Sequence, residues 1–224
     1  MKDLFSFLAI LLFSILQAQE LKDFRAPNGY KKIVEVKGDL DKDGKAETVI
    51  VFLTDRKVES DFNKGYLREI FILKNINDKL KTWKRNSNII FASDTGFYPE
   101  SSPLPDLQIK NNCLIISQQF NTNSRHTQSY KHTFRFQNGD FYLIGSVGNF
   151  NDTCEFNILN DINFSTGKVI VDEQYYPCNE EEETPGKNFY KEFIYKSKLS
   201  VKMDNFIPGE NSIRIPKTNK YFNF

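Results

Sequence analysis

The chain of 224 residues is long enough for one large domain or two small ones, and its 39% hydrophobic and 26% charged residues are typical of a globular protein. Lysine and arginine number 30 against 29 aspartates and glutamates, a net charge of +1. This balance supplies no strong field for nucleic acid or an anionic membrane, which argues against a general nucleic-acid binder.

The first predicted element is a leader. Residues 1–18 carry Lys2 near the amino terminus, an apolar stretch over residues 5–16 and the small residue Ala18, which is the pattern of a secretory signal peptide. The alternative is an N-terminal membrane anchor, but the stretch is shorter than the roughly 20 apolar residues of a comfortable span. We therefore expect cleavage after Ala18. The mature protein should start at Gln19, be exported to the periplasm or secreted, and contain no membrane span.

An acidic loop follows the first predicted strand (residues 31–36) and leads into the second (residues 47–53). Carboxylates alternate through it, and Gly44 permits the sharp turn that points their oxygens inward. Ca²⁺ takes about six to eight hard oxygen ligands, which such a turn supplies. The predicted metal ligands are Asp39, Asp41, Asp43, Lys45 through its backbone carbonyl, and Glu47. A helix-loop-helix EF-hand would need a glutamate where Ile50 stands, so the loop is predicted to join two strands.

The alternative for this loop is a solvated acidic turn without an ion, because Asp and Gly favour turns for conformational reasons alone. Three alternating aspartates would, however, repel one another without a cation. Calcium is favoured over magnesium because the ligand set is flexible and made wholly of protein groups. The cofactor predicted from the sequence is therefore Ca²⁺.

The loop resembles the calcium loops of integrin-type FG-GAP and VCBS repeats, in which the pattern D-x-D-x-D-G-x-x-[DE] lies between strands. The matching residues are Asp39, Asp41, Asp43, Gly44 and Glu47. The resemblance implies that this loop binds calcium. Proteins of that type carry many repeats in a propeller, whereas this chain has one copy, so a propeller is not expected.

The rest of the chain reads as short strands separated by turns. Phe and Tyr, with 21 and 10 copies, suit half-buried strands. Asn138-Gly139 is the strongest turn signal, since both positions tolerate positive φ. After the second strand, the predicted strands are residues 67–74, 79–84, 89–91, 107–109, 114–116, 130–136, 141–144, the two arms of a hairpin around Gly167, and a late strand at residues 189–201.

This pattern predicts a mainly β fold, which is an antiparallel meander, a sandwich or a partly closed barrel with at most one or two short helices. Residues 55–66 are the segment that could form a short helix. The loops at residues 98–105 and 177–187 are too short to mark a domain boundary. We therefore expect a single β-rich domain over residues 19–224, with a C-terminal extension from about residue 177.

The chain contains three cysteines, and an exported protein can form disulfides. Strand partners around the Gly167 turn should have residue numbers that sum to 333, and Cys154 and Cys178 sum to 332. The two cysteines therefore fall nearly opposite, within the slack of one bulge, and are the predicted disulfide. The alternative is three buried free thiols, since spacing alone does not fix connectivity. Cys113 is interpreted as a small hydrophobe at a strand start.

A second resemblance is broader. The segments GDLDKDGKAETVIVF, LQIKNNCLIISQQF, YKHTFRFQNGDFYLIG and NFSTGKVIV occur in that order, and the likeness covers about residues 31–171. Together they resemble an uncharacterised family of exported bacterial proteins that pair one such acidic loop with a hairpin like the third segment and a TGK turn. The resemblance implies a β-rich exported domain and supplies no activity.

Other candidate sites are weaker. His126 and His132 lie six residues apart on one predicted strand and share a face, but nothing supplies a third metal ligand at that spacing. Residues 180–183 are interpreted as a solvated acidic run. Asp94 and Glu100 could form a carboxylate pair, yet the sequence has no hydrolase, zinc-protease or phosphate-loop motif. No catalytic residue is predicted.

The function expected from these features is an exported, calcium-binding, non-enzymatic β domain that binds a protein or glycan partner in the cell envelope. One specific version is an inhibitor or immunity-like protein whose exposed loop at residues 98–105 blocks a secreted enzyme. The alternative is a calcium-assisted hydrolase of envelope or extracellular glycans or peptides. Such an enzyme would need carboxylates with shifted pKa values in a pocket beside the acidic loop.

Overall fold

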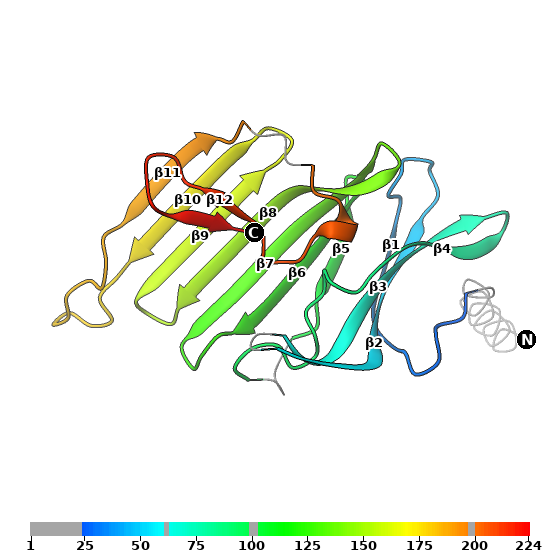
Figure 1. The fold of residues 1–224 in the computed structure, drawn as a ribbon, viewed down its shortest axis with the longest axis horizontal. Helices are drawn as coiled ribbons and strands as arrows, with labels where there is room; N and C mark the ends of the chain where they lie inside the picture. The colour runs from blue at the N-terminus through cyan, green and yellow to red at the C-terminus, as the bar shows by residue number, and fades with distance from the viewer. Residues whose placement is uncertain (1–23, 61–62, 99–102, 197–199) are drawn as a thin grey trace, which may run out of the picture.

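The computed structural model describes residues 24–60, 63–98, 103–196 and 200–224. These residues form antiparallel β-sheets and one short 3-10 helix (Figure 1), which confirms the predicted mainly β class. The predicted leader, residues 1–18, lies outside the described residues. Within the described ranges, no helix is long and apolar enough to cross a membrane.

Two sheets follow one another along the chain, and neighbouring strands pair in chain order as a meander. The first sheet contains β1 (Lys31–Gly38), β2 (Glu47–Glu59), β3 (Lys64–Ile76) and β4 (Lys79–Asn86). The large sheet contains β5 (Asp106–Lys110), β6 (Cys113–Asn121), β7 (His126–Gln137), β8 (Asp140–Asp152), β9 (Phe156–Asn163), β10 (Lys168–Tyr175) and β11 (Phe189–Ile194). A C-terminal segment adds the helix η2 (Met203–Asn205) and a hairpin of β12 (Ser212–Arg214) and β13 (Tyr221–Asn223).

Three of the hairpins turn on residues with left-handed backbone angles, among them the predicted Asn138-Gly139 turn. Asn138 and Gly139 have φ values of 51° and 79°, and the Asn77-Asp78 and Asn111-Asn112 turns also have positive φ at both positions. Asn, Asp and Gly are the residues that tolerate this conformation, and two such positions match the twist of the flanking strands. These local signals therefore set the register next to the turns of β3 with β4, β5 with β6 and β7 with β8, and a bulge shifts the register further along the first and last of these pairs.

Two local predictions are wrong. Residues 55–60 and 63–66 form no helix, because residues 55–59 continue β2 and residues 64–66 begin β3, with Lys57 opposite Tyr66, while residues 61–62 lie outside the described residues. Cross-strand pairing decides the structure of this segment. Residues 89–91 form no strand but a buried bend, in which the Asn86 side chain accepts the N–H of Ile89 at 3.0 Å and the Gln118 side chain accepts the N–H of Phe91 at 2.8 Å.

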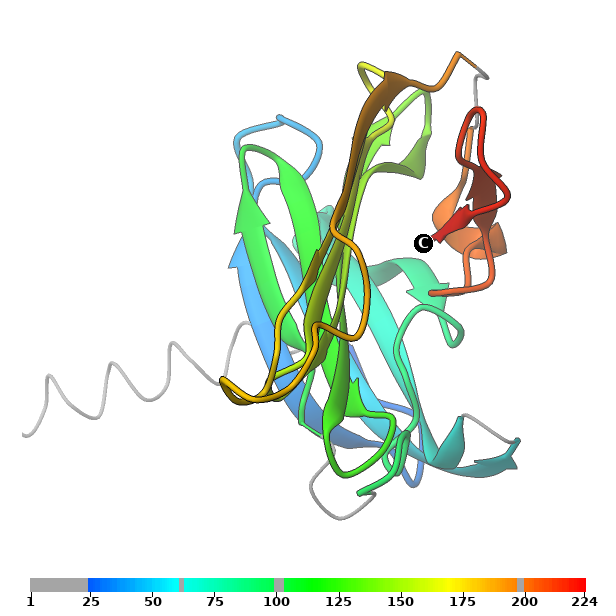
Figure 2. The same ribbon diagram turned by 90° about the vertical axis from the view of Figure 1, so that its left-hand side faces the viewer.

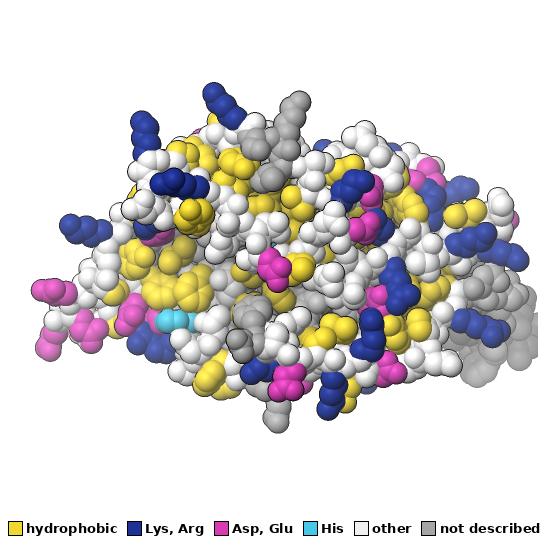
Figure 3. Space-filling model, in the orientation of Figure 1, with side chains coloured by type: hydrophobic (Ala, Val, Ile, Leu, Met, Phe, Trp, Pro, Cys, Tyr) yellow, Lys and Arg dark blue, Asp and Glu magenta, His cyan; other side chains and the backbone are white. Residues whose placement is uncertain are grey.

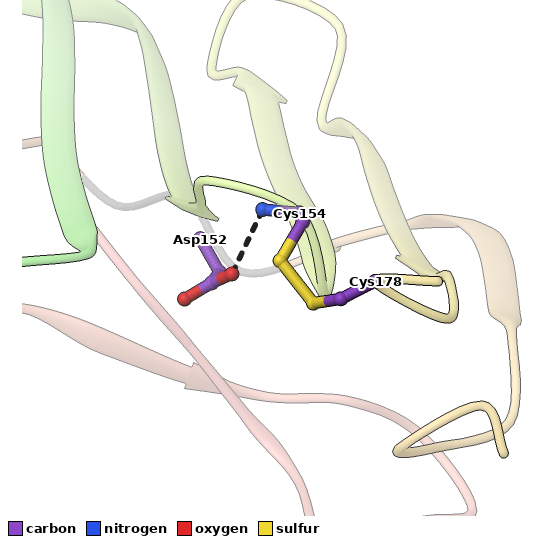
Figure 4. A group of neighbouring side chains, drawn as sticks. All are labelled: Asp152, Cys154 and Cys178. Atoms are coloured by element: carbon purple, nitrogen blue, oxygen red, sulfur yellow. Dashed lines mark hydrogen bonds between the residues drawn. A yellow bond between two sulfur atoms is a disulfide. The ribbon is translucent and has the colours of Figure 1, made fainter. Parts of the chain in front are cut away.

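The predicted disulfide is present. Cys154 and Cys178 are joined with a Cα–Cα distance of 5.2 Å, and they lie just beyond the last β9–β10 pair, Phe156 opposite Tyr175 (Figure 4). The residue numbers of paired positions sum to 331 rather than the predicted 333, which shifts the register by two without separating the cysteines. Cys113 is free and buried, as expected for a small hydrophobe.

The two sheets share one hydrophobic core and meet at the edges β1 and β5. Gly38 at the end of β1 lies so close to β5 that a Cβ atom there would be 2.6 Å from Ile109 Cγ2. The largest contributions to the core come from both sheets and from the C-terminal segment. Fully or almost fully buried members include Val49, Val51, Ile70, Ile72, Leu114, Ile116, Phe134, Phe141, Val169, Met203, Phe206, Phe222 and Phe224.

The C-terminal segment covers part of one face of the large sheet (Figure 2). Lys84 in β4 pairs with Asp204 at 2.6 Å and with Asp140 at 2.7 Å, so the first sheet and the start of β8 are both tied to it. The side chain of Asn86 also donates to the Met203 carbonyl at 2.8 Å. The residues beyond 177 therefore add β11 to the large sheet and a lid to its core.

Candidate metal centre

The acidic loop lies between β1 and β2, and its backbone turns where the sequence places flexible residues. Gly44 has a φ of 80° and Lys42 a φ of 68°. Asp39 shapes the turn, because its Oδ1 accepts the N–H of Lys42 at 2.6 Å and its Oδ2 accepts the N–H of Gly44 at 3.1 Å. Such side-chain bonds to the following backbone are the usual reason for Asp at the start of a turn.

Three predicted ligands converge in this loop. Carboxylate oxygens of Asp39, Asp41 and Asp43 all lie within 4.8 Å of one another. The fourth predicted side chain, Glu47, is completely buried at the start of β2, where its Oε2 accepts the N–H of Leu40 at 2.8 Å. Lys45 contributes its N–H to Asp43 Oδ1 at 2.8 Å. The loop thus gathers hard oxygen donors of the kind that calcium prefers.

Two carboxylate oxygens in the loop are buried without a hydrogen-bond donor. Asp41 Oδ1 and Glu47 Oε1 have no hydrogen-bond partner among the described residues. Burial raises the pKa of Glu47, and the charge of Asp41 adds to this. A buried carboxylate oxygen without a donor is costly, and a bound cation would remove that cost.

Lys74, on β3, is a site residue that the sequence analysis does not include. Its ammonium group contacts Asp41 Oδ2, lies 2.9 Å from Asp43 Oδ2, and lies 3.8 Å from Glu47 Oε1. Burial disfavours the ammonium, but hydrogen bonds to Asp41 and Asp43 raise its pKa overall, and the bond from Lys74 lowers the pKa of Asp43. Lys74 therefore supplies a positive charge at the point where these carboxylates converge.

The register of the β2–β3 hairpin is the signal that could have identified Lys74. Thr48 pairs with Leu73, so one step further along the ladder Glu47 stands opposite Lys74. A lysine at the end of an apolar strand, opposite an acidic loop, is placed to form a cross-strand ion pair. The ammonium group of Lys74 also lies over the Trp83 ring, with its nitrogen 5.0 Å from the ring centre.

The loop is anchored to both sheets. Asn112, in the β5–β6 turn, donates its side-chain N–H to the Asp39 carbonyl at 2.9 Å. Gly38, the residue before Asp39, is the position that packs against Ile109 in β5. Anything that makes the loop more rigid would therefore also strengthen the junction between the two sheets.

The other candidates do not form a metal site with the described residues. His126 and His132 share a face of β7 as predicted, but His126 Nε2 lies 3.1 Å from Asp152 Oδ2 and the His132 ring stacks on Tyr130. Asp94 accepts a hydrogen bond from Ser93, and Glu100 lies outside the described residues. Within the acidic run, Glu182 accepts a hydrogen bond from the Asn179 side chain.

A second group of possible ligands surrounds the disulfide (Figure 4). Asp152 is buried, and its Oδ1 accepts the N–H groups of Cys154 and Glu155, both at 2.9 Å, and a bond from Arg125 at 2.8 Å. These donors keep the pKa of Asp152 below its usual range although burial opposes the charge. Both sulfur atoms are committed to the disulfide, so the group is a structural network that fixes this end of the sheet.

Comparisons of the chain with protein-family models, with curated proteins and with solved structures find no match. The two family resemblances stated above therefore remain predictions from the sequence.

Proposed function

We propose that this protein is an exported β domain that binds one calcium ion in the loop between β1 and β2 and binds a protein or glycan partner in the cell envelope without acting as an enzyme. The observation that carries the metal site is the convergence of Asp39, Asp41 and Asp43 beside the buried Glu47, with two oxygens that lack a donor among the described residues. The disulfide supports export, since disulfides persist in oxidising compartments.

The loop residues have distinct parts in this proposal. Asp41, Asp43 and Glu47 offer carboxylate oxygens, Asp39 holds the turn and can offer a further oxygen, and Lys45 offers its backbone carbonyl. A bound calcium ion would neutralise these carboxylates and replace the ammonium of Lys74. Because the loop is bonded to Asn112 of the large sheet, the expected role of the ion is to stiffen the junction of the two sheets.

The hydrolase alternative has less support. It needs carboxylates in a concave pocket near the loop, with a path for substrate. A groove of about 390 Å³ lies on the large sheet, and none of its lining residues is a carboxylate or belongs to the acidic loop. The inhibitor version would use residues 98–105, of which 99–102 lie outside the described residues, while Tyr98 and Leu104 are exposed.

The test of calcium binding is thermal unfolding of the metal-stripped protein with and without calcium. A ligand that binds only the folded state at about 100-fold excess over its Kd adds roughly 2.7 kcal/mol, which raises the Tm by several degrees. The shift should disappear in Asp41→Ala and persist in the control Glu181→Ala, whose side chain lies in the exposed acidic run. An unchanged Tm in millimolar calcium would reject the metal site.

Lys74→Met should increase calcium affinity while weakening the metal-free protein. Removing an ammonium that pairs with partly buried carboxylates should cost about 2 kcal/mol without metal, and calcium should restore this loss. The corresponding gain in affinity is about 30-fold, since 1.4 kcal/mol is tenfold. The measurement is a calcium titration of Lys74→Met beside Lys79→Met, a control in an exposed lysine at the start of β4.

An equal calcium affinity in Lys74→Met and the wild type would mean that the ammonium does not stand where the ion binds. A lower affinity in Lys74→Met would have the same consequence. Either result would mean that calcium, if it binds the acidic loop, binds at a position away from the Lys74 ammonium.

A further inference from the structure

The large sheet carries a groove on the face that the C-terminal segment only partly covers. β7, β8 and β9 form its floor and β13 forms one wall, with a volume of about 390 Å³. The space-filling view of this face shows hydrophobic side chains gathered over the large sheet, with a histidine at their border (Figure 3). Its lining residues include Gln128, Tyr130, Phe150, Asn160, Tyr221 and Asn223.

The lining combines aromatic rings with amide groups and has no charged side chain. Tyr130, Phe150 and Tyr221 provide the rings, and Tyr221 is 61% exposed. Asn160 lies opposite Gly148 on the groove face of the sheet, and Asn223 lines the groove from β13. Gln128 uses its N–H₂ group on the carbonyls of Ser129 and Asn149, both at 3.1 Å, so its side-chain oxygen remains available as an acceptor.

The aromatic surface continues beyond the groove toward the disulfide. Phe150 and Phe156 have ring centres 5.2 Å apart, and the Phe156 and Tyr175 centres are 6.3 Å apart. His126 packs on both phenylalanines, at 5.3 Å from Phe150 and 5.1 Å from Phe156. A row of rings across β8, β9 and β10 therefore extends the groove into a surface that suits an elongated ligand.

We propose that this groove binds a neutral carbohydrate chain, which specifies the partner class of the proposed function but does not depend on the calcium site. Sugar rings present apolar C–H faces that pack on aromatic side chains and hydroxyl groups that bond to amides. Ligand sites in general combine an apolar lining with a few placed polar groups. The amides of Asn160 and Asn223 and the acceptor oxygen of Gln128 are the groups that would meet those hydroxyls.

Other ligand classes fit less well. An anionic ligand would meet no cationic side chain among the lining residues. A purely apolar ligand would cover the Asn160 and Asn223 amides and leave them without partners, which is costly. A peptide strand could not add through its backbone, because β7, β8 and β9 already pair with one another across the floor of the groove.

The test is isothermal titration calorimetry of the purified full protein with neutral oligosaccharides built from glucose, mannose, galactose or N-acetylglucosamine. We expect at least one of them to bind, and Tyr221→Ala to weaken that binding about tenfold, the usual scale for an aromatic contact residue. The matched control is Tyr190→Ala in β11, because Tyr190 is also 61% exposed but stands opposite Asp172, on the other face of the sheet. Asn160→Ala, which leaves the aromatic walls intact, should also weaken binding.

Absence of binding by every neutral oligosaccharide of the panel would overturn the proposal, and so would equal effects of Tyr221→Ala and Tyr190→Ala. The titrations are run with calcium and with EDTA, and binding is expected in both. Retained saccharide binding without a calcium shift in Tm would reject the metal proposal alone. A calcium shift without saccharide binding would reject the groove proposal alone.

Discussion

Phe206→Ala should lower the free energy of unfolding by about 4 kcal/mol, the usual cost of deleting a large buried side chain. Phe206 is fully buried in the C-terminal segment, and its ring contacts rings from β7 and from the chain end. The centre-to-centre distances are 4.7 Å to His132, 5.7 Å to Phe134 and 6.5 Å to Phe224. The cavity left by alanine would open directly onto the large sheet.

The measurement is urea unfolding at neutral pH of Phe206→Ala beside Ile207→Ala. Ile207 is the next residue along the chain and is 38% exposed, so its replacement should cost less than about 1 kcal/mol. A cost for Phe206→Ala as small as that of the control would mean that the C-terminal segment is only loosely docked. Because this segment includes β13, the same result would also weaken the case for a preformed wall of the groove.

His132 should make the protein sensitive to acid. Its ring is buried between Tyr130 and Phe206, and burial lowers its pKa to about 3. The folded protein therefore holds His132 neutral, while in the unfolded chain it titrates near 6.5. As the pH falls below about 6.5 the unfolded state binds one more proton, so the free energy of unfolding decreases by about 1.4 kcal/mol per pH unit until about pH 3.

The measurement compares the wild type with His132→Phe at pH 6.5 and pH 4.5. Phenylalanine keeps an aromatic ring in the site and removes a ring nitrogen, Nε2, that has no hydrogen-bond partner in the described part of the chain. The wild type should lose about 2.3 kcal/mol more than the variant over this interval, because half of the unfolded-state histidine is already protonated at pH 6.5. Parallel pH profiles for the two proteins would show that His132 does not stay neutral in the folded state.

Signals between near neighbours in the sequence predicted much of the fold. The Asn77-Asp78, Asn111-Asn112 and Asn138-Gly139 turns specify their hairpins directly, because few residues adopt two successive positive φ angles. Counting the opposed positions around the Gly167 turn identified the Cys154–Cys178 disulfide, although the observed β9–β10 register differs from the predicted one by two residues.

Contacts between distant segments were not predictable in this way. Lys84 meets Asp204 across 120 positions, and Asn86 bonds to Met203 across 117. Nothing in the local pattern of either segment indicates the other, so neither the division into two sheets nor the C-terminal lid follows from hydrophobic alternation. Residues 55–60 and 63–66 show another error, since β2 and β3 pair through residues that were expected to be able to form a short helix.

The candidate metal centre illustrates both situations. The five predicted loop residues lie within nine consecutive positions, so the convergence of Asp39, Asp41 and Asp43 follows from a single turn. Lys74 comes from the neighbouring strand and required the register of β2 with β3. The groove was not predicted at all, because its lining comes from β7, β8, β9 and β13 and is defined only once the C-terminal hairpin is placed on the sheet.

The most direct measurement is isothermal titration of calcium into the metal-stripped protein. The expected result is one ion bound per chain by the wild type, no binding by Asp41→Ala, and tighter binding by Lys74→Met. Heat of binding that is absent in the wild type, or that persists unchanged in Asp41→Ala, would show that the loop between β1 and β2 is an acidic turn neutralised by Lys74 and not a calcium site.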